Sequence, residues 1–130
     1  MEPSIKAKNI SIKFNITSPK LELDIDTHLI EQVLINLILN AVDACKNQDN
    51  SEIKVLASQN SNRDIVLKVI DNGSGIPQDI LENIFVPFFT SKTTGSGIGL
   101  SLCKQIILLH KGRIIVKSIE GEGSVFSLVF

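Results

Sequence analysis

The sequence contains no Trp, no Tyr and a single Met, so its apolar core must be built mainly from Ile, Leu and Val. Its two cysteines, Cys45 and Cys103, stand far apart and form no metal-binding pattern. We expect both to be small buried apolar groups. The 13 basic and 14 acidic residues nearly cancel and are mixed along the chain, which argues against a nucleic-acid partner.

The sequence also lacks an apolar run of membrane length and an N-terminal signal peptide. Its most apolar stretch, residues 33–39, is interrupted by Asn36 and followed by Asn40. We therefore expect a cytoplasmic domain that makes no membrane contact. Because the sequence ends in strand-like residues, we expect residues 1–130 to be one domain of a longer protein. The rest of that protein could be membrane-anchored. A domain of this length can bury a core without disulfides or structural metal.

Alternating apolar and polar residues predict strands, whereas apolar residues at spacings of three and four predict helices. The expected strands are Ile5–Ile16, Leu21–Ile25, Glu52–Ser58, Asp64–Ile70, Arg113–Lys117 and Ser124–Phe130. The expected helices are a long one that is capped by Asp26 or Thr27, a short one at Gln78–Ile84, and a long one from Gly97 to the neighbourhood of His110. Strand pairs separated by helices favour an α/β two-layer sandwich, with a mixed, mainly antiparallel sheet covered by helices on one face.

The segment DNGSGIP begins at Asp71, directly after a predicted strand. A carboxylate at a strand end can accept a hydrogen bond from an exocyclic amine, and Gly73 and Gly75 would let the backbone approach a flat ring. The alternative is a tight hairpin turn, which Asn-Gly favours. This segment alone supports the two interpretations about equally, although Pro77 leads into a helix and not into a returning strand.

Asn36 and Asn40 are amides on an otherwise apolar helix, one turn apart, so they share a stripe of its surface. A buried amide is costly unless it is hydrogen-bonded. An Asn oxygen can also bind Mg²⁺, which takes further ligands from waters and substrate phosphates. The ordinary alternative, amides bonded to a neighbouring loop, is better supported by these two residues taken alone.

A second glycine cluster, Gly95, Gly97 and Gly99, precedes the last predicted helix. Its spacing differs from the dinucleotide-binding motif and no strand comes directly before it, so that interpretation fails. Small residues still expose backbone N–H groups, a helix start attracts phosphate, and Lys92 would add a positive charge. A flexible linker and a solvated Lys are the alternatives. The residues around the second glycine cluster, Phe85–Ser96, are expected to form a mobile loop. The Phe-rich stretch Phe85–Phe89 would anchor the hinge of that loop and also contribute to the core.

His28 and His110 are the only histidines. Neither has the spacing of a metal ligand, and neither has a Ser or Cys partner that would make a catalytic triad. His110, near the end of the last helix, is expected to interact favourably with the helix dipole.

Together these segments resemble the catalytic and ATP-binding domain of bacterial sensor histidine kinases. NLILNAVDA (Asn36–Ala44) resembles the N box of that family, DNGSGIP its first glycine box, FVPFFTSK (Phe85–Lys92) its F box, and GSGIGLSL its second glycine box. The resemblance covers Ser4–Phe130 and implies the Bergerat ATP-binding fold, shared with gyrase B, the mismatch-repair ATPases and a heat-shock chaperone. The pairing of NAVDA with PFFTSK is similar to kinases of the nitrogen-regulation type.

The resemblance implies a site for ATP and Mg²⁺ beneath a mobile ATP lid. Asn40 would coordinate the metal and Asn36 would support it, and these two with Lys92 would be the catalytic residues. Asp71 would bind the adenine amine, and Ser124 would contact adenine through water. The remaining nucleotide contacts would come from Gly73, Gly75, Ile76, Phe88, Thr90, Gly95, Gly97, Gly99 and Leu100.

The same resemblance implies that the domain donates the γ-phosphoryl group of ATP to a histidine. Hydrolytic relatives carry a Glu at the position of Asn36, and an amide cannot take a proton from water, so we expect slow ATP hydrolysis. Because no phosphoacceptor box is present, the histidine would lie on a dimerisation domain missing from this sequence. A response regulator receiver domain would act downstream. Two alternatives stay open, an anti-sigma-type Ser/Thr kinase and a non-catalytic ATP-binding module.

Overall fold

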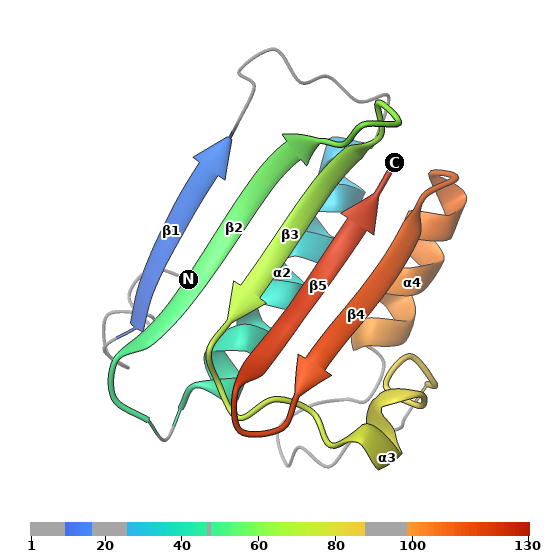
Figure 1. Cartoon of the computed structure of the whole chain (residues 1–130). Coiled ribbons are helices and arrows are strands. Elements are labelled where there is room, and N and C mark those ends of the chain that lie inside the picture. Colours follow the sequence, from blue (N-terminus) through green and yellow to red (C-terminus); the bar gives the residue numbers. More distant parts are fainter. Residues whose placement is uncertain (1–9, 17–25, 47, 88–98) are drawn as a thin grey trace.

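The computed structural model describes residues 10–16, 26–46, 48–87 and 99–130. These residues form a five-stranded sheet with helices on one face (Figure 1). The strands are β1 (Ile10–Ile16), β2 (Ser51–Gln59), β3 (Ile65–Asp71), β4 (Arg113–Ile119) and β5 (Gly123–Val129). The helices are α2 (Thr27–Ala44), α3 (Gln78–Leu81) and α4 (Gly99–Leu109).

The sheet is mixed, with the strand order β1-β2-β3-β5-β4. β1 pairs with β2 in parallel, and the chain returns between them through α2, which supplies the crossover that a parallel pair requires. The pairings of β2 with β3, β3 with β5 and β4 with β5 are antiparallel. The predicted α/β two-layer sandwich with a mixed, mainly antiparallel sheet is therefore confirmed.

Most of the predicted elements lie within one or two residues of their expected bounds, which is the usual uncertainty of element ends. β1 is described from Ile10, so residues 5–9 of the predicted first strand lie outside the described residues. The expected strand Leu21–Ile25 also lies outside them, as does Gly97, the expected start of the last helix. That helix, α4, is described from Gly99.

The short helix α3 is the element whose predicted end is wrong. It stops at Leu81 and does not continue to Ile84. Beyond it, the N–H groups of Asn83 and Val86 each bond to the carbonyl three residues earlier, at 3.0 Å. These tight turns place Ile84 among the buried core side chains.

The start of α2 is joined to the end of α4. Asp26 caps α2, since its side chain accepts a hydrogen bond from the Leu29 N–H at 3.2 Å. The Asp26 N–H donates to Nε2 of His110 at 3.1 Å, and Nδ1 of the same ring lies 2.7 Å from the Ile106 carbonyl oxygen. In the tautomer in which Nε2 accepts this bond, Nδ1 donates to the Ile106 carbonyl oxygen. His110 thus joins the start of α2 to the end of α4 through two hydrogen bonds, and its expected interaction with the helix dipole stays a prediction.

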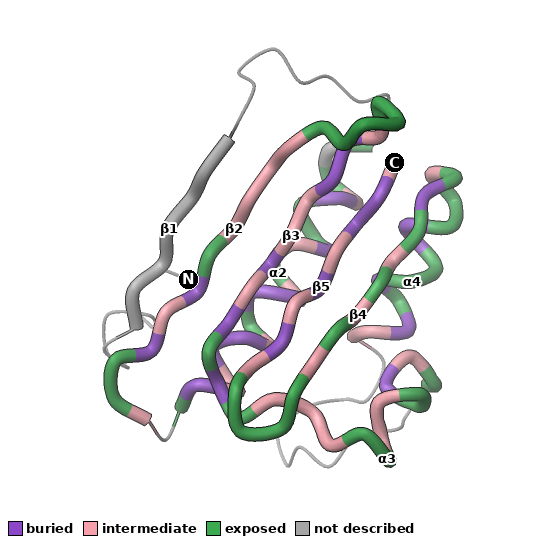
Figure 2. Tube along the Cα trace, in the orientation of Figure 1, coloured by how far each residue is buried: buried purple, intermediate pink, exposed green. Residues whose placement is uncertain are grey.

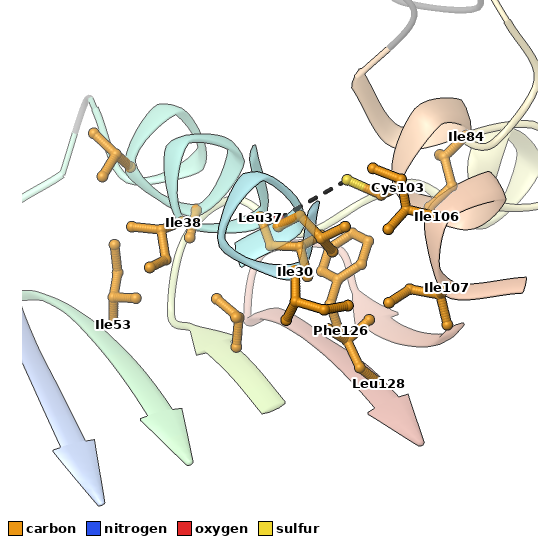
Figure 3. Close-up of a cluster of buried hydrophobic side chains, with 14 of the residues drawn as sticks. Ile30, Leu37, Ile38, Ile53, Ile84, Cys103, Ile106, Ile107, Phe126 and Leu128 are labelled. Atoms are coloured by element: carbon orange, nitrogen blue, oxygen red, sulfur yellow. Dashed lines mark hydrogen bonds between the residues drawn. The ribbon is translucent and has the colours of Figure 1, made fainter. Parts of the chain in front are cut away.

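The core lies between the sheet and the two long helices. Figure 2 shows where the buried positions fall along α2, α4, β3 and β5, and Figure 3 shows the packed side chains. Its largest fully buried members are Leu37, Ile53, Ile107 and Leu128. Among the described residues, no helix is long and apolar enough to cross a lipid bilayer.

Both cysteines are free and buried, as predicted. The Sγ atom of Cys103 lies 3.9 Å from the Val33 carbonyl oxygen on α2, so this thiol joins the two long helices (Figure 3). Burial raises the pKa of Cys103 to about 11, because the thiolate would be poorly solvated there. Cys103 is therefore a structural thiol and not a reactive one.

The contribution of α2 to stability can be tested with two Leu residues on that helix. Leu37 is 1% exposed and Leu39 is 47% exposed. We expect Leu37→Ala to lower the free energy of unfolding by about 2–5 kcal/mol, because it leaves a cavity in the core. Leu39→Ala should lower it by less than about 1 kcal/mol. Urea denaturation of both variants checks this, and equal losses would show that α2 does not pack as described.

Candidate nucleotide-binding site

Side chains on the helix-covered face of the sheet form rows across β3, β5 and β4. Two successive rows are apolar: Leu67, Leu128 and Ile114, followed by Val69, Phe126 and Val116. The next row, where β3 ends, consists of Asp71, Ser124 and Ser118. The sheet thus changes from apolar to polar within one row, at the edge of the core.

Asp71 is the charged member of this row. It is only 6% exposed, and its Oδ1 accepts a hydrogen bond from the Gly73 N–H at 2.9 Å. Burial raises the pKa of Asp71 above its ordinary value of 3.8, while backbone bonds from Gly73 and Ser124 oppose that rise. The chain continues from here into α3, so the alternative of a hairpin turn after Asp71 is excluded.

Gly73 and Gly75 lie against backbone from other parts of the chain. A Cβ atom at Gly73 would stand 2.6 Å from the Ala44 carbonyl oxygen, and one at Gly75 would overlap the Ile119 carbonyl. Gly75 also has a φ of +71°, which other residues rarely adopt. Between them, the Ser74 N–H bonds to the Ala44 carbonyl at 3.0 Å. Both glycines are needed because backbone from other parts of the chain lies against them. Their contact with a nucleotide stays a prediction.

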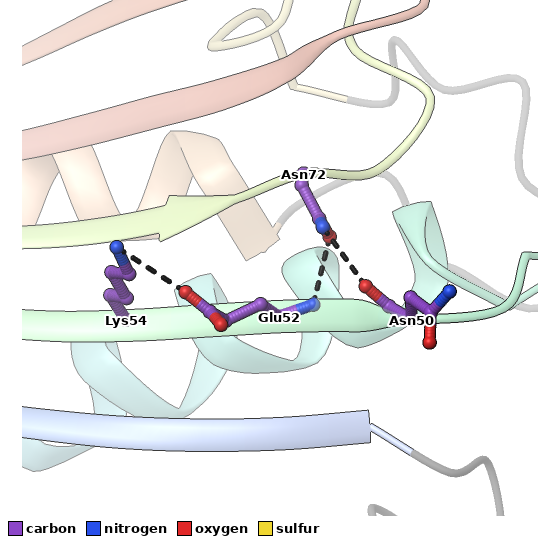
Figure 4. A network of polar contacts seen from close by, with 4 residues as sticks. All are labelled: Asn50, Glu52, Lys54 and Asn72. Carbon is purple, nitrogen blue, oxygen red and sulfur yellow. Dashed lines mark hydrogen bonds and ion pairs between the residues drawn. The ribbon is translucent and has the colours of Figure 1, made fainter.

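Asn72 holds the end of β3 to the start of β2, as Figure 4 shows. Its Oδ1 accepts from the Glu52 N–H at 2.8 Å, and its Nδ2 donates to the Asn50 carbonyl at 3.1 Å. The Gln48 amide also donates to the Asn72 carbonyl at 2.8 Å. Sequence reasoning treated Asn72 only as part of a turn signal. Its amide in fact fixes the backbone next to Asp71.

Ser118 was not predicted to belong to the site. Its Oγ accepts a hydrogen bond from the Ile76 N–H at 2.7 Å, and it lies 3.0 Å from the Gly123 carbonyl oxygen. It also lies 2.8 Å from Oγ of Ser124, which was predicted as a site residue. The Ile76 N–H is thereby occupied within the protein. A single Ser in a strand carries no signal that could have identified this role.

The amide stripe of α2 meets the start of α4. Nδ2 of Asn36 donates to the Gln32 carbonyl at 3.1 Å, which leaves its Oδ1 directed elsewhere. A Cβ atom at Gly99 would stand 3.4 Å from that Oδ1. Asn40 lies one turn further along α2 and is half-buried. The structure therefore brings the Asn stripe together with Gly99, the one member of the second glycine cluster that lies among the described residues.

A metal at Asn40 would find few protein ligands. Within the described residues, no group of three or more His, Cys, Asp or Glu side chains could hold an ion. Asn40 would supply one neutral oxygen. That donor fits Mg²⁺, which usually keeps several waters and binds substrate phosphates, and does not fit an ion that needs a cage of protein ligands.

Several predicted site residues lie outside the described residues: Phe88, Thr90, Lys92, Gly95 and Gly97. Their roles stay predictions. Leu100 is described, and its side chain packs partly against the core in the first turn of α4. Phe85 also packs against the core, as predicted, and Nζ of Lys104 lies 5.5 Å from the centre of its ring.

The described parts of the site gather at one end of the molecule, the lower end in Figure 1. The end of β3, the turn between β4 and β5, the end of α2 and the start of α4 all lie there. A helix start carries partial positive charge and unpaired N–H groups, so the start of α4 attracts phosphate. This end of the fold therefore combines a buried carboxylate, which can accept hydrogen bonds, with a helix start, whose dipole favours anions.

Comparison with curated proteins finds sensor kinases. The chain is 39% identical over 123 residues to the sensor histidine kinase ZraS of Salmonella typhimurium, covering 95% of this chain and 26% of that protein. It is 38% identical over 107 residues to the signal transduction histidine-protein kinase AtoS of Escherichia coli, covering 82% of this chain and 17% of that protein. The chain thus spans about a quarter or less of these relatives.

Comparison with solved structures gives the same result. The nucleotide-free catalytic domain of histidine kinase ThkA superposes with a TM-score of 0.86 at 36% identity, covering 99% of this chain and 83% of that chain. ThkA in complex with the response regulator protein TrrA superposes with a TM-score of 0.80 at 32% identity, covering 99% of this chain and 36% of that chain. These matches confirm the Bergerat ATP-binding fold.

The family model that describes histidine kinase-, DNA gyrase B- and HSP90-like ATPases matches residues 25–130. That range includes the polar row, both glycine clusters and the amide stripe. The nitrogen-regulation subtype stays a prediction. On these findings the chain belongs to the family of histidine kinase-, DNA gyrase B- and HSP90-like ATPases, and it is similar to sensor histidine kinases and to a solved histidine kinase catalytic domain.

Proposed function

We propose that this domain binds Mg-ATP at the polar end of the sheet and donates the γ-phosphoryl group to a histidine on the dimerisation domain of its parent protein. The observation that carries the proposal is the buried carboxylate of Asp71 at the end of β3. Burying a carboxylate costs free energy unless it makes a compensating interaction. Because the chain belongs to a family of ATPases, we infer that the Asp71 carboxylate accepts a hydrogen bond from the adenine amine. Ser124 lies beside it in the same row.

The amide stripe supports phosphoryl transfer over hydrolysis. Asn40 would hold Mg²⁺, which when bound neutralises charge on the phosphates. Hydrolysis needs a base for the attacking water, and the amide of Asn36 cannot serve as one. Its Nδ2 is already bonded to the Gln32 carbonyl, so only a carbonyl oxygen remains toward Gly99. The site would therefore keep ATP intact until a nucleophile is presented.

Neither histidine of this chain is well placed to accept the phosphoryl group. Both ring nitrogens of His110 are in hydrogen bonds. His28 is exposed in the first turn of α2, twelve positions before Asn40, and therefore about 18 Å from it along the helix axis at 1.5 Å per residue. The acceptor would accordingly lie in the part of the parent that this chain does not span.

The partners follow from this arrangement. A dimerisation domain would present the histidine, and the receiver domain of a response regulator would take the phosphoryl group from it. The complex of ThkA with a response regulator protein supports the second partner. Because ATP is a cytoplasmic substrate, we place the domain in the cytoplasm, whether or not the parent is anchored in a membrane.

Replacing Asp71 tests the base site. Asp71→Asn keeps the size of the side chain but removes its charge, and we expect Mg-ADP affinity to fall about 10- to 100-fold, the value of a hydrogen bond to a charged group. Asp79→Asn removes an exposed carboxylate from α3 and should change affinity less than about twofold. Isothermal titration calorimetry measures both. An unchanged affinity in Asp71→Asn would remove the centre of the proposed site.

The pH dependence of stability tests the burial of Asp71. Its folded-state pKa is raised, so its contribution to stability is fully present below the ordinary value of 3.8 and is lost as the pH rises through the raised pKa. Asp71→Asn does not titrate at this position. The free energy of unfolding of the wild type, minus that of the variant, should therefore decrease as the pH rises above the ordinary value of 3.8. A flat or rising difference in urea titrations would contradict the assignment.

Phosphoryl transfer can be tested with radiolabelled ATP. We expect slow Mg-ATPase turnover and no acid-labile phosphoprotein from this chain alone, because it has neither a base at Asn36 nor an acceptor histidine within reach. Adding the phosphoacceptor domain of the parent protein in trans should produce a labelled histidine on that domain. Label on His28 or His110, or fast hydrolysis that Asn36→Ala abolishes, would contradict the proposal.

A further inference from the structure

Ser118 stands at the centre of three polar contacts that no assigned role uses. The Ile76 N–H donates to its Oγ at 2.7 Å. The Gly123 carbonyl oxygen lies 3.0 Å from the same atom, and Oγ of Ser124 lies 2.8 Å from it. Ser118 is half-buried, and Ser124 is only 5% exposed. The contacts therefore compete little with water.

The number of protons decides how these contacts are made. A hydroxyl has one proton to donate and two lone pairs that accept. All three contacts are satisfied in one arrangement only. Ser118 accepts from the Ile76 N–H and from the Ser124 hydroxyl, and it donates to the Gly123 carbonyl. If Ser118 instead donated to Ser124, it would leave the Gly123 carbonyl without this donor.

In this arrangement the hydroxyl proton of Ser124 is donated to Ser118. Toward a ligand, the Ser124 hydroxyl can therefore act only as a hydrogen-bond acceptor. Asp71, its neighbour across β3 and β5, likewise offers only acceptors when ionised. The two side chains then form a surface of acceptors at the place where the base is expected to bind.

We propose that Ser118 is a specificity-determining residue of the base site, which acts by holding the proton of Ser124. An acceptor surface favours a purine with an amino group at position 6, directly or through water, and disfavours one with a carbonyl there. Without Ser118, the Ser124 hydroxyl is free to turn and donate to a carbonyl. Ser118 is thus a positioning residue, and its role rests on the proposed function, which puts adenine beside Asp71.

The test compares ADP with inosine diphosphate, which carries a carbonyl in place of the amine. Affinities of the wild type, Ser118→Ala and Ser118→Thr are measured by calorimetry with Mg²⁺. The wild type should prefer ADP. Ser118→Ala should lower the ratio of the two affinities by about threefold to tenfold, the value of one hydrogen bond. Ser118→Thr keeps the hydroxyl and should restore the ratio. If Ser118→Ala does not fold, Ser118→Cys replaces it, because a thiol is a weak donor and acceptor.

A second genetic background, Ser124→Ala, distinguishes an effect on base specificity from a purely structural effect. With Ser124→Ala there is no proton to hold, so adding Ser118→Ala should leave the ratio unchanged in this double-mutant cycle. Equal weakening of both nucleotides in Ser118→Ala alone would show a purely structural role and overturn the proposal, while ADP binding that depends on Asp71 would leave the proposed function standing. A wild type that binds neither nucleotide would overturn both.

Discussion

The burial of one carboxylate at the end of β3 is the constraint on which this end of the molecule depends. Asp71 is only 6% exposed, and this burial disfavours its charged form and raises its pKa. The chain around it is correspondingly tight. A Cβ atom at Gly123 would overlap the Asp71 carbonyl, and one at Gly73 would meet the end of α2. These positions need glycine because backbone from neighbouring segments lies directly against them.

The rows across the sheet separate stability from function. Leu128 and Phe126 belong to successive apolar rows beneath the helices, and Ser124 continues the same face of β5 into the polar row. Successive positions on one face of this strand thus supply first the core and then the site. The same holds on α2, where buried Leu37 lies next to the stripe that begins at Asn36. A helix or strand that serves both purposes joins the site directly to the packed core.

Local patterns predicted the elements well, because periodicity and capping act over a few residues. Asp26 as the cap of α2 and Asp71 as a strand end are examples. Long-range pairing was harder. The sequence does not state that β1 lies parallel to β2, and α3 ended early because Ile84 is drawn into a core built by other elements. The resemblance to a family, and not periodicity, supplied ATP and the roles of the Asn residues.

The residues missed in the site share one property: their partners are distant in sequence. Asn72 bonds to an N–H group 20 positions away, and Ser118 to one 42 positions away. Such contacts exist only after the sheet is assembled, so neither propensity nor motif spacing reveals them. Asn72 lies inside the DNGSGIP motif, so a structural role for its side chain could have been considered from the sequence. Ser118 stood in an ordinary strand, and only its hydrogen bonds distinguish it.

The proposed chemistry gives these supporting bonds a purpose. A site that contains a general base can hydrolyse ATP whenever water is present. Imprecise positioning of ATP there only lowers the rate of that reaction. A site that must hold ATP without spending it on water depends on holding the base and phosphates in register until a histidine arrives. Asn36 provides no base, and its fixed amide leaves no proton acceptor in its place. The rigidity contributed by Asn72 and Ser118 would then serve to keep the donor aligned while it waits.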